Sequence, residues 1–168
     1  PMADPRSTLG QKAAALPKML SFYAWWYPTR WLGWGRWPRY SEFGRLATHL
    51  RFVARMSRKL ARESFHGMLV YQAGLQNKQA FLFRLVDVAN ELFAMSASVS
   101  RAHALARTGA AEAREAGDLA DVFCRMARRR IRALFGELWD NDDPPRYRAA
   151  LAIMDDRHAW LERGTIGL

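Results

Sequence analysis

Apolar residues recur about every 3.6 positions through four stretches of the chain beyond residue 40, which predicts four amphipathic helices. Ser41 is a good N-cap for the first helix and Asn77 for the second, which Thr108-Gly109 ends. Pro144 and Pro145 suit the first turn of the last helix. No stretch has the pattern of a strand. The helices are expected at about residues 42–74, 77–107, 111–139 and 144–164.

Helices of this length, joined by short connections, pack as an antiparallel bundle. The predicted fold class is therefore all-α, an antiparallel four-helix bundle formed by residues 41–168. In the second helix the apolar positions make a wide stripe, from which we expect Leu85, Leu92 and Phe93 to lie in the core. The stripe consists of Leu82, Leu85, Val86, Ala89, Leu92, Phe93, Ser96 and Val99.

Residues 1–40 follow a different pattern and are expected to form a Trp-rich basic N-terminal arm. The pattern favours a short helix over 13–27, with Pro17 in its first turn or at a kink. The next stretch, YPTRWLGWGRWPRY (27–40), brings two Pro and two Gly in quick succession. No regular element longer than a turn or two is expected there.

The charge is distributed unevenly along the chain. It carries 26 Lys and Arg against 16 Asp and Glu, a formal net charge of +10. Residues 1–62 hold twelve basic residues against only Asp4 and Glu42, so the whole excess falls in the first third. The aromatic residues are skewed the same way, because five of the seven Trp lie within residues 25–37. This part of the chain is therefore the expected contact surface.

Three classes of protein are disfavoured by the sequence. The single cysteine, Cys124, excludes a disulfide framework. The longest uncharged apolar stretch of the arm, 19–29, is about half of what a bilayer-spanning helix needs, so no segment is expected to cross a membrane. Residues 1–17 lack the apolar core of a signal peptide.

The arm combines the two residue types that meet a lipid surface. Trp and Tyr favour the boundary between water and hydrocarbon, because a flat apolar ring carries one polar group. Arg and Lys reach lipid phosphates on long apolar stems. We therefore expect residues 18–40 to lie at an anionic membrane surface. Docking of the Trp cluster onto protein remains an alternative. Binding to nucleic acid is less favoured, because the recognition motifs for nucleic acid are absent. The candidate interface residues are Lys18, Trp25, Trp26, Arg30, Trp31, Trp34, Arg36, Trp37 and Arg39.

The sequence gives only a weak indication of a metal site. Glu63-x-x-His66 and Asp155-x-x-His158 have the spacing of helical di-iron sites. Such spacings also arise on any charged helix, so solvated surface charge is the preferred interpretation. No metal ligand is assigned.

The sequence also contains a candidate nucleophile and a candidate anion-binding run. Cys124 lies in an apolar stretch, where a buried and inert thiol is expected. The run Arg128-Arg129-Arg130, followed by Arg132, is expected to be a solvated face or docking surface rather than a ligand site. No catalytic or cofactor-binding residue is assigned.

Two stretches of the chain resemble a known family. These are NKQAFLFRLVDVANELFAMSASVSRA (77–102) and the closing RIRALFGEL…YRAALAIMDDRHAWLERG. Both are similar to the extra C-terminal domain of very-long-chain-type acyl-CoA dehydrogenases. The resemblance covers about residues 41–164 and rests on core positions rather than on a catalytic signature.

The resemblance implies a flavoenzyme that removes two hydrogens from a long-chain acyl-CoA in fatty acid β-oxidation and passes electrons to an electron-transfer flavoprotein. FAD and the catalytic glutamate would lie in an upstream dehydrogenase core, of which none is expected within these residues. The chain, which begins at Pro1, would be its accessory domain. It would support a homodimer and peripheral attachment to the inner, cytoplasmic face of a membrane. The alternative is a non-enzymatic helical module that binds an anionic membrane surface or nucleic acid.

Overall fold

The computed structural model describes residues 8–32 and 39–161. Over these residues it contains helices and no strand, which confirms the all-α class. The α-helices are α1 (Leu9–Leu32), α2 (Ala47–Tyr71), α3 (Gln79–Arg107), α4 (Ala113–Gly136) and α5 (Asp143–Met154). Three short 3-10 helices are η2 (Ser41–Leu46), η3 (Gln72–Asn77) and η4 (Ala159–Leu161).

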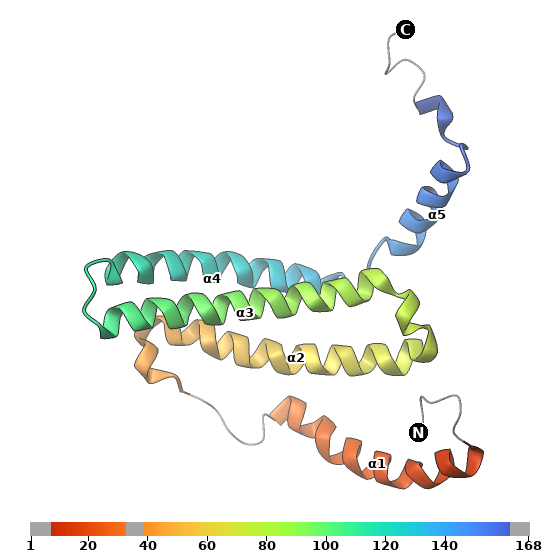
Figure 1. The fold of residues 1–168 in the computed structure, drawn as a ribbon, viewed down its shortest axis with the longest axis horizontal. Coiled ribbons are helices and arrows are strands. Elements are labelled where there is room, and N and C mark those ends of the chain that lie inside the picture. Colours follow the sequence, from red (N-terminus) through yellow and green to blue (C-terminus); the bar gives the residue numbers. More distant parts are fainter. Residues whose placement is uncertain (1–7, 33–38, 162–168) are drawn as a thin grey trace. The chain divides into compact units, whose positions relative to one another are not determined.

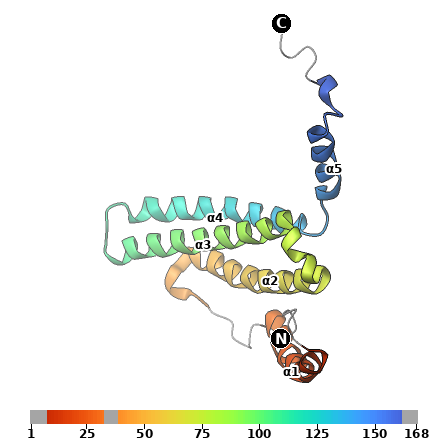
Figure 2. The same cartoon turned by 45° about the vertical axis from the view of Figure 1, so that its right-hand side comes forward.

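The chain divides into two compact units, Pro1–Phe135 and Gly136–Leu168. In the first unit α2, α3 and α4 lie side by side and alternate in direction (Figure 1). The same three helices stay adjacent when the view is turned (Figure 2). Within the first unit, α2, α3 and α4 form a bundle of three helices. The four-helix arrangement is not confirmed, because α5 belongs to the second unit.

The expected helix over 42–74 is interrupted at both ends. Gly44 has a positive φ of 51°, which glycine adopts without strain, and it breaks the helical conformation inside η2, before α2 begins. At the other end Gln72 has φ 45° and the chain tightens into η3 before α3 begins. The regular α-helix therefore covers only Ala47–Tyr71.

The core of α3 is a narrower stripe than the sequence indicated. Leu92 is buried, as expected, and Leu85 is half-buried. Phe93, expected in the core, is 76% exposed, so that prediction was wrong. Both faces of α3 carry apolar residues, and helical periodicity alone does not say which of them packs on α2 and α4. The buried positions are Phe81, Val88, Leu92, Met95, Val99 and Ala102.

Helix α1 is longer than the sequence indicated. It runs through Pro17 and Pro28 as far as Leu32, so the prediction of irregular structure from residue 27 was wrong for 27–32. Proline removes one backbone hydrogen bond from a helix, and the packing of α1 on α2 offsets that loss. The glycines and proline at 33, 35 and 38 lie outside the described residues.

Candidate functional site

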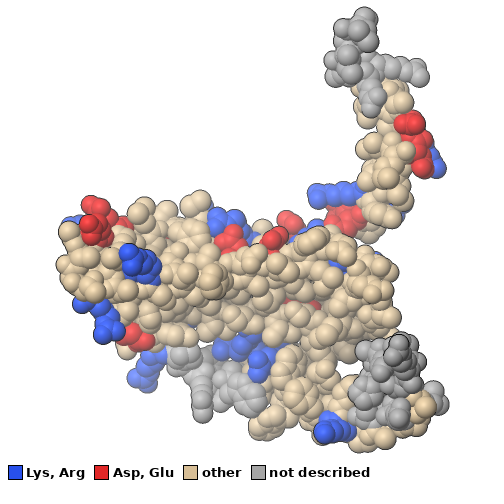
Figure 3. All heavy atoms as spheres, viewed as in Figure 1, with Lys and Arg blue, Asp and Glu red and all other residues tan. Residues whose placement is uncertain are grey.

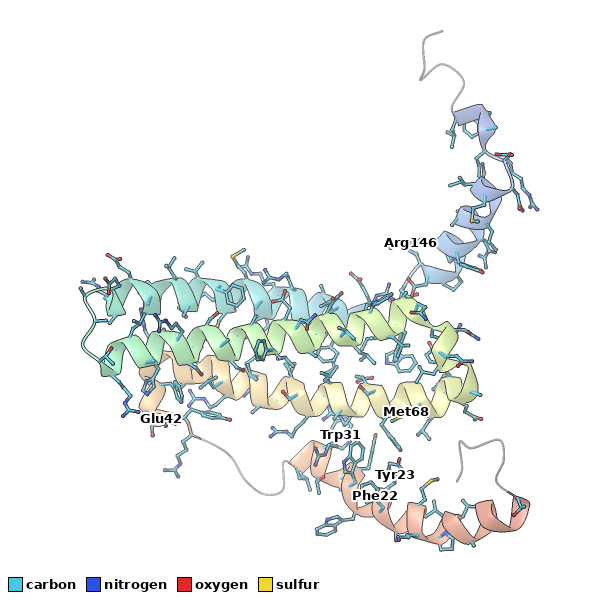
Figure 4. All side chains as sticks on the ribbon, viewed as in Figure 1. Phe22, Tyr23, Trp31, Glu42, Met68 and Arg146 are labelled. Carbon is cyan, nitrogen blue, oxygen red and sulfur yellow. The ribbon has the colours of Figure 1, made fainter. Side chains whose placement is uncertain are left out.

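The inner face of α1 packs on α2 through aromatic rings. Tyr23, Trp26 and Tyr27 surround Phe65 of α2, with ring centroids 4.8, 5.5 and 5.8 Å from the Phe65 ring. Figure 4 shows Tyr23 and Trp31 on the side of α1 that faces α2. Part of the aromatic cluster that the sequence assigned to a membrane therefore packs against protein within this chain.

A series of polar interactions also joins α1 to α2. The hydroxyl of Tyr27 lies 3.0 Å from Nε2 of His66, and Nδ1 of His66 lies 3.5 Å from a carboxylate oxygen of Glu63. The Glu63-x-x-His66 step thus joins α1 to α2. Among the described residues no group of three His, Cys, Asp or Glu side chains could hold a metal ion.

Two arginines fix the C-terminal part of α1. The guanidinium of Arg30 lies 5.1 Å from the ring centroid of Trp26, and that of Arg62 lies 3.9 Å from the ring of Trp31. Nη1 of Arg62 also donates a hydrogen bond to the carbonyl oxygen of Arg30, at 2.7 Å. Burial lowers the pKa of Arg62, against a smaller opposing effect of Glu63. Arg62 therefore serves the α1–α2 contact.

The outer face of α1 is apolar and exposed. Trp25 is 68% and Phe22 57% exposed, and Leu32 is also exposed at the end of the helix. Lys18 is also exposed and lies about one turn before Phe22 and two turns before Trp25. We call Lys18, Phe22, Trp25 and Leu32 the outer face of α1. This face places aromatic rings beside a cation, a combination that is found at membrane–water interfaces.

The predicted interface residues are thus divided between two environments. Lys18 and Trp25 lie on the outer face of α1. In contrast, Trp26 packs on Phe65 of α2, Arg30 stacks on Trp26, and Trp31 contacts Arg62 of α2. Arg39 is exposed, and its carbonyl oxygen accepts a hydrogen bond from Arg51. Trp34, Arg36 and Trp37 lie outside the described residues.

Sequence reasoning missed Phe22 and Leu32. Neither belongs to the Trp and Arg cluster that drew attention to the arm. The spacing of residues in the sequence could have identified them. If the helix is continued through Pro28, one face of it carries Lys18, Phe22, Trp25 and Leu32.

Two exposed apolar strips lie on the helices of the bundle. One strip, on α3, consists of Phe83, Val86 and Phe93; the other, on α4, consists of Leu119, Val122 and Met126. The spacings of three, four and seven residues place each set on one side of its helix. In the space-filling view few charged atoms interrupt the middle of the bundle (Figure 3). Contiguous exposed apolar surface of this kind is typical of a contact with another protein surface.

The remaining candidate groups are engaged in the bundle. Cys124 is buried, and burial raises its pKa to about 11, with a smaller contribution from Asp121. A thiol of that pKa is almost fully protonated at neutral pH and is a poor nucleophile. Glu91 receives hydrogen bonds from Arg130, at 2.9 Å for the Nη2 donor.

No described helix is long and apolar enough to span a membrane. The exposed apolar surfaces of the described residues include the outer face of α1 and the strips on α3 and α4.

These features define an all-helical domain, and comparison with known proteins places it in a family. Residues 52–158 match the family model for the ACAD9/ACADV C-terminal domain. The chain therefore belongs to the family of ACAD9/ACADV C-terminal domains, as the resemblance in sequence indicated.

The curated relatives are longer than this chain. The probable acyl-CoA dehydrogenases FadE10 of Mycobacterium bovis and of Mycobacterium tuberculosis are both 48% identical to it over 166 residues. The matched region is 98% of this chain and 26% of each relative, so the chain spans about a quarter of their length. No solved structure shows a significant match.

Proposed function

We propose that this chain is the C-terminal accessory domain of an FAD-dependent acyl-CoA dehydrogenase. The observation that carries the proposal is the match of nearly the whole chain to a quarter of proteins named as probable acyl-CoA dehydrogenases. In this proposal the flavin and the catalytic glutamate belong to a dehydrogenase core outside residues 1–168. An electron-transfer flavoprotein accepts the electrons of the whole enzyme.

The first proposed role of the domain is to dock onto other protein surfaces of the enzyme. The exposed strips on α3 and α4 support this role, because the removal of side chains such as Phe93 and Leu119 from water lowers the free energy of the complex. The partner surfaces are the dehydrogenase core and a second copy of the enzyme in a homodimer.

The second proposed role is peripheral attachment to the cytoplasmic face of an anionic membrane. The outer face of α1 supports it, since Phe22 and Trp25 are exposed beside Lys18. Basic residues attract the domain to the surface, at about 1 kcal/mol each, and the aromatic rings retain it.

The enzymatic part of the proposal is tested on the intact polypeptide that the gene encodes. We expect it to be yellow, with one flavin per chain by absorbance, and to oxidise long-chain acyl-CoA. Residues 1–168 expressed alone should be colourless and inactive. An intact polypeptide without flavin would contradict the proposal, and so would a gene that encodes no dehydrogenase core.

The docking part is tested by changing Phe93 and Leu119 to Ser in the intact polypeptide. We expect the dimer to dissociate more readily in light scattering, or the domain to become sensitive to proteolysis. The matched control changes Tyr147 and Leu151 of α5, which are also exposed, to Ser. Equal behaviour of the two variants would contradict docking through α3 and α4.

A further inference from the structure

A small basic pocket lies between α2 and α4. Its volume is about 320 Å³. Four cationic side chains line it, Arg55 and Lys59 from α2 and Arg128 and Arg132 from α4, and no acidic residue does. The two pairs come from parts of the sequence about seventy residues apart, and they face one another because α4 packs along α2.

Buried aromatic rings form the floor of the pocket and orient the cations. The guanidinium carbons of Arg128 and Arg132 lie 4.7 and 5.6 Å from the ring centroid of Phe52. Nζ of Lys59 lies 4.5 Å from the ring centroid of Phe135. Phe52 and Phe135 are themselves buried. An arginine that stacks on a ring keeps the N–H groups at its edge free to donate hydrogen bonds.

These cations differ from their neighbours on α4. Arg125 and Arg130 each pair with a carboxylate, of Asp121 and Glu91 respectively. In the part of the chain that the structure describes, none of the four pocket cations forms an ion pair with an acid. Burial lowers the pKa of Arg128, and the nearby Arg132 and Arg55 lower it further. The fold thus holds like charges together with no anion of its own.

We propose that this pocket binds a multiply charged phosphate group, either a phosphomonoester or a pyrophosphate. Several cations around a small volume match a compact anion with more than one charge. Arginine forks bind phosphate oxygens in pairs of parallel hydrogen bonds. A phosphodiester carries a single negative charge, so it matches four surrounding cations less well.

The phosphate group has two possible sources, the head group of a lipid or a free phosphorylated compound. The chemistry that the pocket recognises is the same for both. The site depends neither on the outer face of α1 nor on dehydrogenase activity, so it can be tested separately from the proposed function.

The first experiment titrates the intact polypeptide with inorganic pyrophosphate by calorimetry, at constant ionic strength in chloride. In one variant Arg128→Gln is combined with Arg132→Gln. The control combines Arg101→Gln with Arg129→Gln, which removes the same charge from exposed positions of α3 and α4. We expect the pocket variant to bind pyrophosphate at least about tenfold more weakly, since each charge-assisted hydrogen bond corresponds to about that factor. The control should stay within about twofold of the unchanged protein.

A second measurement needs no variant. Phenylglyoxal modifies accessible arginines, and mass spectrometry locates the products. Pyrophosphate should protect Arg128 and Arg132 from modification while Arg101 and Arg129 react as before. This readout keeps the proposal testable if the pocket variant fails to fold.

Vesicles distinguish the two sources. Phosphatidylcholine vesicles that contain phosphatidic acid, a phosphomonoester, are compared with vesicles that contain phosphatidylglycerol at matched surface charge. A lipid source predicts preferential binding to phosphatidic acid, which the pocket variant loses and pyrophosphate displaces. If the source is a free phosphorylated compound, the pocket variant should bind vesicles as the unchanged protein does. The variant should still lose its binding of pyrophosphate.

Either result supports the pocket as a phosphate site. The proposal is overturned if pyrophosphate neither binds the unchanged protein nor protects Arg128 and Arg132. It is also overturned if the control variant loses as much affinity as the pocket variant, because the effect would then be one of net charge alone.

Discussion

Leu92 and Phe93 are neighbours in the sequence of α3, but they lie in opposite environments. Leu92 is 4% exposed in the core of the bundle, and Phe93 is 76% exposed on the apolar strip of α3. One residue therefore stabilises the fold of the chain, and the other is available to a partner.

Substitution by alanine should separate these roles. Leu92→Ala is expected to lower the free energy of unfolding by about 2–5 kcal/mol, since it removes buried methyl groups and leaves a cavity. Phe93→Ala should change it by less than about 0.5 kcal/mol, as exposed substitutions do. Chemical denaturation of the 168-residue chain measures both. Similar losses for the two variants would show that Phe93 is buried and that the phase of α3 described here is wrong.

His49 and Asp121 join α2 to α4 inside the bundle. Nε2 of His49 is 2.8 Å from one carboxylate oxygen of Asp121, and Nε of Arg125 is 2.8 Å from the other. The hydrogen bond from His49, followed by that from Arg125, lowers the pKa of Asp121 against the opposing effect of burial. The ionised carboxylate is therefore the form that stabilises the fold.

This interaction should make the stability of the chain depend on acid pH. An aspartate with a lowered folded pKa stabilises the fold above its unfolded pKa of about 3.9 and loses that contribution as the pH falls through the folded value. Between pH 6 and pH 3 the urea-unfolding free energy should fall more steeply for the unchanged chain than for Asp121→Asn. The exposed Asp142→Asn is the control and should keep the full slope. Parallel curves for Asp121→Asn and the unchanged chain would contradict this account.

At the scale of elements, the close approach of α2 and α3 depends on a glycine. Gly67 is buried in α2, and a Cβ built there would lie 2.6 Å from Cζ of the Phe81 ring, which is itself buried in α3. The absence of a side chain at Gly67 lets the aromatic ring fill the space between the helices.

Gly67→Ala should therefore destabilise the chain, although alanine is the better helix former by about 1 kcal/mol. The clash with Phe81 in a closely packed core outweighs that gain. Gly10→Ala in α1 is the control, because nothing lies within 4 Å of its Cβ, and it should stabilise the helix or leave it unchanged. Thermal unfolding compares the two; a stabilising Gly67→Ala would mean that α2 and α3 lie farther apart.

The sequence was sufficient to predict most helices but not their partners. The periodicity over 77–107 predicted α3 closely, and Pro144 and Pro145 do lie in the first turn of α5. It could not predict that α1 continues through Pro28, because the aromatic contacts with Phe65 that hold it come from another helix. Whether α5 joins the bundle also depends on tertiary packing rather than on its own residues.

The basic pocket illustrates the same limit. The arginines at 128 and 132 were expected to form a solvated or docking face, because their own segment is close to neutral. Their facing partners, Arg55 and Lys59, lie in the strongly basic first third of the chain. Only the packing of α4 on α2 brings both sets together. The division of the arm into an inner and an outer face likewise follows from the contact with α2.

At the scale of the whole molecule, the described surfaces differ in chemical character. The apolar strips on α3 and α4 suit contacts with protein, and the outer face of α1 suits a lipid surface. Our central proposal is that the domain attaches its enzyme to an anionic membrane through the outer face of α1.

The most direct test is co-sedimentation of the intact polypeptide with anionic vesicles. Phe22→Ser combined with Trp25→Ser should weaken binding at least about tenfold, since each inserted ring contributes on the order of 1.5–3 kcal/mol. Added salt should weaken the binding of the unchanged protein without abolishing it. The control, Tyr147→Ser with Trp160→Ser, removes two aromatic residues that are equally exposed elsewhere and should bind like the unchanged protein. Unchanged sedimentation of the Phe22 and Trp25 variant, or an equal loss in the control, would contradict the claim.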